Sequence, residues 1–245
     1  MSESDFISRR NFVKVSGAAA LGAAFIKLGD DVLTVEHARA DVTKTPPASP
    51  DEALKRLMDG NKRFVDAIKK SPRRTVEVRK DVAEGQTPFA AILACADSRV
   101  APEIIFDEGI GDIFVVRVAG NIVNPTNYGV LGSLEFGVLA LGASLIMVLG
   151  HTRCGAVAGA IEALKKGTEF PGSINNIVNT IGPAVEAVKG EPGDLLDNSI
   201  VSNVKFGVDK LNGSVPVIAD KVREGKVKIV GANYDLRTGE VKIVT

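Results

Sequence analysis

QTPFAAILACADSR, at residues 86–99, is the stretch that decides the fold this sequence predicts. Its apolar run at 89–94 lacks the polar alternation of a half-exposed strand, so it predicts a strand that is buried on both faces of a parallel sheet. A second run of this kind, at 144–149, ends two residues before His151. Because ligands gather at the carboxyl ends of strands in such sheets, we expect the residues that follow the two runs to form one site.

These two segments hold both cysteines of the chain, Cys95 and Cys154, and one of its two histidines, His151. Two thiolates and one imidazole are ligands that Zn²⁺ prefers, and three protein ligands leave a fourth tetrahedral position for water, as in catalytic zinc sites. The alternative is a disulfide between the two cysteines, which an oxidising compartment favours. Metal analysis together with thiol counting in denaturant distinguishes the two.

Four separated motifs carry a resemblance to a known family: CADSR at 95–99, RVAGN at 117–121, GSLEF at 132–136 and GHTRCGA at 150–156. Together with the tail GANYDLRTGEV at 231–241, they resemble the beta-class carbonic anhydrases. The resemblance implies a zinc-dependent carbonate dehydratase, a lyase with one Zn²⁺ per subunit. Its expected reaction is the reversible hydration of carbon dioxide to bicarbonate and a proton by a zinc-bound hydroxide.

The same resemblance implies roles for individual residues. Cys95, His151 and Cys154 correspond to the permanent zinc ligands. Asp97 corresponds to a switch residue that either takes the fourth zinc position or pairs with Arg99, so these two residues form the expected catalytic dyad. The guanidinium of Arg99 suits this role because it can hold a carboxylate through two parallel hydrogen bonds.

The resemblance also implies a small, dry and apolar hollow for carbon dioxide. The residues at the family positions that line it are Gln86, Val100, Phe114, Val118, Phe136 and Gly155. Ile92 stands where a bicarbonate-inhibited branch of the family has tryptophan, which favours the open, active form. Phe136 stands where many relatives have tyrosine, so a hydroxyl-dependent role is lost at that position.

The predicted fold class is α/β, with a mainly parallel central sheet flanked by helices and a C-terminal β-hairpin. Ser49 and Glu52 form a capping box for a helix at 50–69. The other expected elements are a buried strand at 112–118, a helix that begins directly after Cys154, helices at 128–141 and 174–188, and a hairpin of 226–231 and 240–244 around a turn at 235–239.

The amino terminus carries an export pattern. SRRNFVK at 8–14 matches a twin-arginine signal, a weakly hydrophobic run follows at 15–26, and Ala38-Arg39-Ala40 offers small residues to a signal peptidase. The expected organisation is a signal peptide at 1–40, a Pro-rich linker at 41–50 and a catalytic domain at 51–245. Export by the twin-arginine translocation machinery places the mature protein in the bacterial periplasm. A membrane anchor is the alternative, but the apolar run is shorter than the roughly 20 residues of a span.

Charge and composition exclude some partners. The 245 residues carry 30 basic and 30 acidic side chains and no basic run interleaved with aromatic residues, so we expect no nucleic acid partner. No second apolar run is long enough for a stable membrane span after processing. By resemblance, the expected assembly is a homodimer or tetramer, paired through amino-terminal helices and sheet edges.

Two further functions compete with hydration of carbon dioxide. The same metal site could hydrolyse carbonyl sulfide or carbon disulfide, because the attack by hydroxide is alike. The chain could also be a zinc- or bicarbonate-binding component of an envelope complex without useful turnover. The presence of both Asp97 and Arg99 argues against this last function, because metal storage needs neither.

Overall fold

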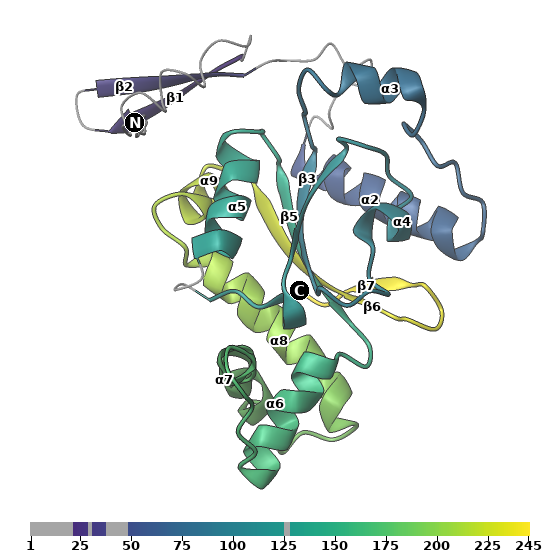
Figure 1. Cartoon of the computed structure of the whole chain (residues 1–245), viewed down its shortest axis with the longest axis vertical. Helices are drawn as coiled ribbons and strands as arrows, with labels where there is room; N and C mark the ends of the chain where they lie inside the picture. The colour runs from purple at the N-terminus through teal and green to yellow at the C-terminus, as the bar shows by residue number, and fades with distance from the viewer. Residues whose placement is uncertain (1–21, 29–30, 38–48, 125–127) are drawn as a thin grey trace, which may run out of the picture.

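The central feature of the fold is a five-stranded sheet in the order β4-β3-β5-β6-β7 (Figure 1). The computed structural model describes residues 22–28, 31–37, 49–124 and 128–245. Strands β3 (Ala90–Ala94), β4 (Ile113–Arg117), β5 (Leu145–His151) and β6 (Lys228–Tyr234) run parallel, and β7 (Val241–Ile243) pairs antiparallel with β6. The predicted α/β class and the C-terminal hairpin are confirmed.

A second sheet lies nearer the amino terminus, where β1 (Gly22–Leu28) and β2 (Asp31–His37) pair antiparallel. The twin-arginine motif at 8–14, the cleavage site at 38–40 and most of the linker at 41–50 lie outside the described residues. The signal peptide and the domain boundaries therefore stay predictions. Within the described part of the chain, no helix combines the length and apolarity that a membrane crossing needs.

Helices cover both faces of the central sheet (Figure 1). Their bounds are α2 (Pro50–Val65), α3 (Val76–Asp81), α4 (Pro102–Ile105), α5 (Tyr128–Leu139), α6 (Gly155–Lys166), α7 (Ile174–Glu186), α8 (Leu195–Asn212) and α9 (Ile218–Arg223), with a 3₁₀ turn η1 (Ala119–Asn121). Side chains of β3 alternate between the two faces: Ile92 packs in a core cluster with residues of α2 and α4, and Leu93 packs in another with residues of α5 and α8. Both strand faces are thus dry, which explains the unbroken apolar runs.

Several predicted elements differ in detail. The helix expected at 50–69 begins at Pro50, where the Ser49 hydroxyl accepts a hydrogen bond from the Glu52 backbone at 3.2 Å, but it ends at Val65. The strand expected to be buried at 112–118 is an edge strand, so Phe114 and Val115 are only half-buried. Strand β5 continues through His151, two residues beyond the apolar run expected at 144–149.

Helix α8 was not predicted, although its 18 residues make it a major part of the core. It packs on β5 and β6. Its Val204 lies so close to Gly150 that a Cβ on Gly150 would approach a methyl group of Val204 to 2.6 Å. The absence of a side chain at Gly150, directly before His151, therefore makes room for α8. The buried face of α8 mixes apolar with polar side chains, which obscures its periodicity.

A buried carboxylate fastens α2 to the segment that follows α4. Asp107 is 1% exposed and accepts hydrogen bonds from Arg63 at 2.8 Å and from the backbone amides of Lys70 at 3.0 Å and Ser71 at 2.9 Å. Burial alone would raise the pKa of this carboxyl, but these hydrogen bonds outweigh it and hold the pKa below its usual 3.8. Asp107 is therefore ionised at neutral pH and stabilises the fold.

Asp107→Asn is expected to lower the free energy of unfolding at pH 7 by about 2–3 kcal/mol. This loss of stability is smaller than the ~3–5 kcal/mol expected when one partner of a fully buried ion pair is removed, because the Arg63 side chain is 23% exposed. The folded-state pKa is depressed, so the stabilisation is present above pH 3.8 and is lost as the pH falls through the lowered value. Urea denaturation at pH 7 and in acid should show that the free energies of unfolding of wild type and Asp107→Asn converge at low pH.

Asp59→Asn is the matched control, because Asp59 lies on α2 and pairs with Lys55 at an exposed site. We expect it to change stability by less than about 0.5 kcal/mol. A constant difference between Asp107→Asn and wild type at every pH would contradict the role assigned to the charge of Asp107.

Candidate metal centre

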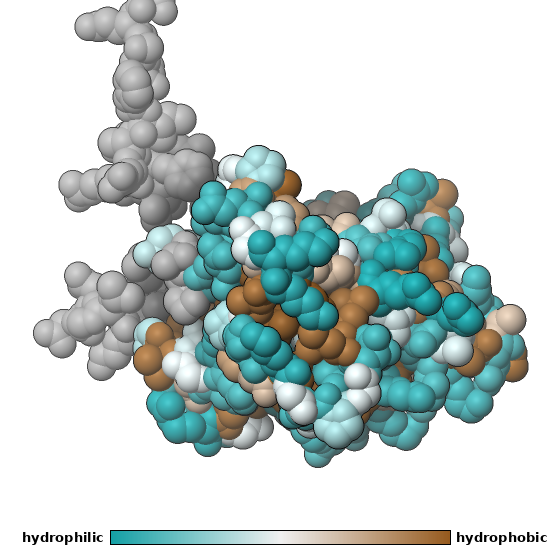
Figure 2. Space-filling model, turned by 90° about the horizontal axis from the view of Figure 1, so that it is seen from below, coloured by the Kyte–Doolittle hydropathy of each residue, from teal (hydrophilic) through white to brown (hydrophobic). Residues whose placement is uncertain are grey.

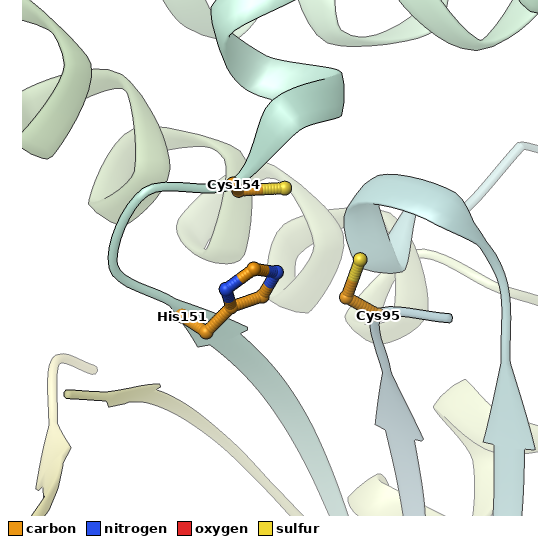
Figure 3. Close-up of side chains that lie close together, drawn as sticks. All are labelled: Cys95, His151 and Cys154. Carbon is orange, nitrogen blue, oxygen red and sulfur yellow. The ribbon is translucent and has the colours of Figure 1, made fainter. Parts of the chain in front are cut away.

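Three buried side chains from separate segments converge at the carboxyl edge of the sheet (Figure 3). Cys95 directly follows β3, His151 is the last residue of β5, and Cys154 is the N-cap of α6. Their ligand atoms all lie within 4.8 Å of one another, and the residues are 5%, 0% and 2% exposed. Both cysteines are free thiols, so the structure does not contain the alternative disulfide.

The order of the strands explains this convergence. After β3 the chain crosses to β4 on one side, then returns to β5 on the other side of β3. The end of β3 and the end of β5 therefore border the point where strand order reverses, which is where open α/β sheets bind ligands. Cys95 and His151 are adjacent for this reason, although 56 positions separate their numbers.

The imidazole of His151 is oriented for metal binding. Its Nδ1 lies 2.9 Å from the carbonyl oxygen of Thr152, which assigns the proton to Nδ1 and leaves the lone pair of Nε2 directed at the two sulfurs. Nε2 is buried and has no hydrogen-bond partner among the described residues. Thr152 is itself held by hydrogen bonds with Tyr234 and Leu236. An unpaired buried nitrogen facing two thiols fits the donor set of a zinc ion.

The two thiols perturb each other. Hydrogen bonding from Cys154 lowers the pKa of Cys95 against the effect of burial, and His151 lowers it further. The same contact, with burial, raises the pKa of Cys154. A divalent cation that binds both sulfurs as thiolates would displace the thiol protons. The backbone amide of Gly120 also donates to the Cys95 sulfur, at 3.3 Å.

Asp97 and Arg99 form a bidentate pair next to these residues. Arg99 donates from Nε and Nη2 to the two carboxylate oxygens at 2.9 and 2.7 Å, and its backbone amide donates at 3.0 Å. The hydrogen bonds from the Arg99 side chain depress the pKa of Asp97 far below its usual 3.8. A carboxylate oxygen lies 3.9 Å from His151 Nε2, but Asp97 is outside the group of three converging ligands. Its place as a fourth ligand stays a prediction.

Arg117 supports the loop that carries Cys95 and Asp97. From the end of β4 it donates to the carbonyl oxygens of these two residues, at 3.1 Å and 2.6 Å respectively. Arg117 thus ties the end of β4 to the loop after β3 through backbone carbonyl oxygens. The RVAGN motif identifies the residue without showing its contacts.

The expected substrate-pocket residues lie in several places. Val100 is fully buried in the core cluster on the α2 face. Phe114 and Phe136 lie near each other, with their ring centroids 6.3 Å apart. Phe114 and Val118 line a shallow hollow between β4 and α5. Gln86 is exposed and Gly155 begins α6. Their role in a common pocket stays a prediction.

Sequence comparisons agree with this geometry. The profile of a family described as "Carbonic anhydrase" matches residues 90–241. The chain is 40% identical over 194 residues to "Carbonic anhydrase 2" of Mycobacterium tuberculosis, which covers 79% of this chain and 92% of that protein. It is 37% identical over 198 residues to "Carbonic anhydrase" of Mycolicibacterium smegmatis, with 81% and 95% covered.

Solved structures share the architecture. The beta-carbonic anhydrase CcaA superposes with a TM-score of 0.62 at 26% identity, over 78% of this chain and 94% of that one. The Coccomyxa beta-carbonic anhydrase in complex with acetazolamide superposes with a TM-score of 0.60 at 27% identity, over 78% and 85%.

Proposed function

This chain belongs to the beta-class carbonic anhydrase family, and from that membership we propose that it hydrates carbon dioxide reversibly at the centre formed by Cys95, His151 and Cys154, with zinc as the metal. The family is one of lyases, so the reaction class follows from membership. The observation that carries the proposed site is the convergence of two sulfurs and an unpaired Nε2 within 4.8 Å. Three ligands of these types match a zinc site with one open position.

Zinc bound at this centre supplies Lewis acidity, which lowers the pKa of water and makes it a nucleophile toward carbon dioxide near neutral pH. The chain's own residues supply the geometry. Arg99 holds the Asp97 carboxylate against its guanidinium, which would leave the fourth position of a bound metal to solvent. One oxygen of the Asp97 carboxylate lies 3.9 Å from His151 Nε2, so in this orientation it would accept a hydrogen bond from solvent at a bound metal. The dyad would thus control whether solvent or Asp97 occupies the fourth position of a bound metal.

Stopped-flow measurement of carbon dioxide hydration, on protein whose zinc content has been determined, tests this function. We expect turnover that scales with zinc content. Zinc-loaded protein with no rate above the uncatalysed reaction would contradict the function and favour a binding protein. Rates of hydrolysis of carbonyl sulfide and carbon disulfide, measured on the same protein, show whether the site prefers either of them to carbon dioxide.

We also propose that the enzyme is exported as a folded protein and loses its signal peptide near Ala40. The support is the SRRNFVK motif at 8–14, and folded export would protect the Cys95 and Cys154 thiolates with metal before the protein reaches the periplasm. Amino-terminal sequencing of the periplasmic protein tests the proposal. A protein that still begins at Met1 would contradict processing.

We propose that the enzyme assembles at least as a homodimer. The β4 edge of the sheet is free among the described strands, and Phe136 and Tyr128 on neighbouring α5 are 53% and 81% exposed. Figure 2 shows apolar side chains gathered on one face of the molecule, with polar side chains around them. Surfaces of this kind are typical of protein contacts. Light scattering that gives the mass of a single chain at working concentration would contradict the dimer.

A further inference from the structure

Helix α8 buries polar side chains beside the metal centre. Ile200 of this helix packs in one cluster with Cys95 and Cys154, yet its neighbours Ser199 and Asn203 are also buried, at 0% and 6% exposure. Burial of an amide is costly unless the amide forms hydrogen bonds. The amide of Asn203 forms such a hydrogen bond with a residue distant in sequence: its Nδ2 donates to the carbonyl oxygen of Gly120 at 2.9 Å.

Gly120 is the residue whose backbone amide donates to the Cys95 sulfur at 3.3 Å. It has a left-handed conformation, with φ 71° and ψ 15°, which directs its amide at the sulfur. A Cβ at this position would approach Ile181 of α7 to 2.8 Å. The conformation of Gly120 is therefore held by packing against α7 and by the hydrogen bond from α8.

We propose that Asn203 is a positioning residue of the metal centre: its amide fixes Gly120 so that the Gly120 N–H remains directed at the Cys95 sulfur. The proposal rests on the metal site proposed above. Two thiolates donate much charge to a zinc ion, and an N–H···S hydrogen bond withdraws part of that charge. Residues that orient ligands in this way affect both metal affinity and reactivity. Through two successive hydrogen bonds, Asn203 would act on the metal centre without itself being a ligand.

Asn203→Leu tests the proposal, because leucine has the same branching and the same number of side-chain heavy atoms as asparagine but cannot donate a hydrogen bond. In the full chain loaded with cobalt(II), we expect the sulfur-to-cobalt charge-transfer band to move to lower energy, since the Cys95 sulfur loses hydrogen bonding. We expect affinity for zinc, measured by competition with a chelator, to fall about tenfold. Asn203→Ser, whose shorter side chain cannot span the distance to Gly120, is expected to show the same changes if Asn203→Leu does not fold.

Ser199→Ala is the matched control. Ser199 lies one turn earlier on α8, is equally buried, and its hydroxyl has no hydrogen-bond partner among the described residues. We expect it to leave the band and the affinity unchanged. The proposal is overturned if Asn203 variants match Ser199→Ala in both measurements, whatever their thermal stability. Wild-type protein that binds cobalt without a sulfur charge-transfer band would instead contradict the metal site itself.

Discussion

Cys154→Ser is expected to abolish metal binding and to reduce carbon dioxide hydration at least about a thousandfold. Serine replaces a thiolate with a hydroxyl that does not ionise at neutral pH, so only one sulfur and one imidazole remain. The lost metal is the group that brings the pKa of water from 15.7 to about 7, and without it hydroxide is scarce at neutral pH. The volume of the side chain changes little, so the packing of Cys154 against Val157 and Ile181 is largely retained.

Zinc content per chain and stopped-flow rate are the measurements. The matched control is wild-type protein stripped of metal by a chelator, which should have the same residual rate and the same thermal unfolding curve as Cys154→Ser. Restoration of zinc should rescue the stripped wild type alone. A variant with one zinc per chain and near-normal turnover would show that Cys154 is not a necessary ligand.

Arg99→Lys and Arg99→Ala are expected to reduce turnover about 10²–10³-fold while zinc stays bound, the size of effect seen when one preorganised electrostatic contact is removed. Lysine keeps the charge but cannot reproduce the two hydrogen bonds to Asp97 at 2.9 and 2.7 Å. Without Arg99, the pKa of Asp97 returns toward 3.8, so Asp97 is still ionised at pH 7. The loss of rate therefore reports the orientation of Asp97, not its charge.

Arg153→Lys is the control for the Arg99 variants. Arg153 is exposed beside Cys154 and has no carboxylate partner among the described residues. We expect normal zinc content and turnover for this variant, and normal zinc content for both Arg99 variants. Near-normal hydration by Arg99→Ala would refute the dyad, whereas loss of zinc from that protein would assign Arg99 to metal retention.

The central strands and the convergence of ligands could be predicted because they depend on short-range patterns. The run at 89–94 is buried on both faces, so its sequence is uniformly apolar, and the CADSR and GHTRCGA motifs place the ligands where two such strands end. Ser49 likewise marked the start of α2 correctly because a capping contact joins residues only three positions apart.

The features that sequence reasoning missed depend on distant partners. Helix α8 carries an apolar stripe of Ile200, Val204, Val208 and Leu211, but its buried Ser199 and Asn203 hide that stripe. The partner of Asn203 is 83 positions away, and the contact exists only because Gly120 has a left-handed backbone. No local pattern in 189–225 signals such a contact. The contacts of Arg117 with the carbonyl oxygens of Cys95 and Asp97 likewise depend on residues about twenty positions away.

The position of His151 inside the β5–β6 ladder, opposite Tyr234, makes the three ligands unequal in freedom. The backbone of His151 is anchored by strand pairing and its imidazole by the Thr152 carbonyl oxygen, whereas Cys154 follows Arg153, whose positive φ of 56° marks a sharp bend in the chain before α6. We therefore expect a bound metal ion to dissociate first from the Cys154 sulfur and last from the His151 nitrogen.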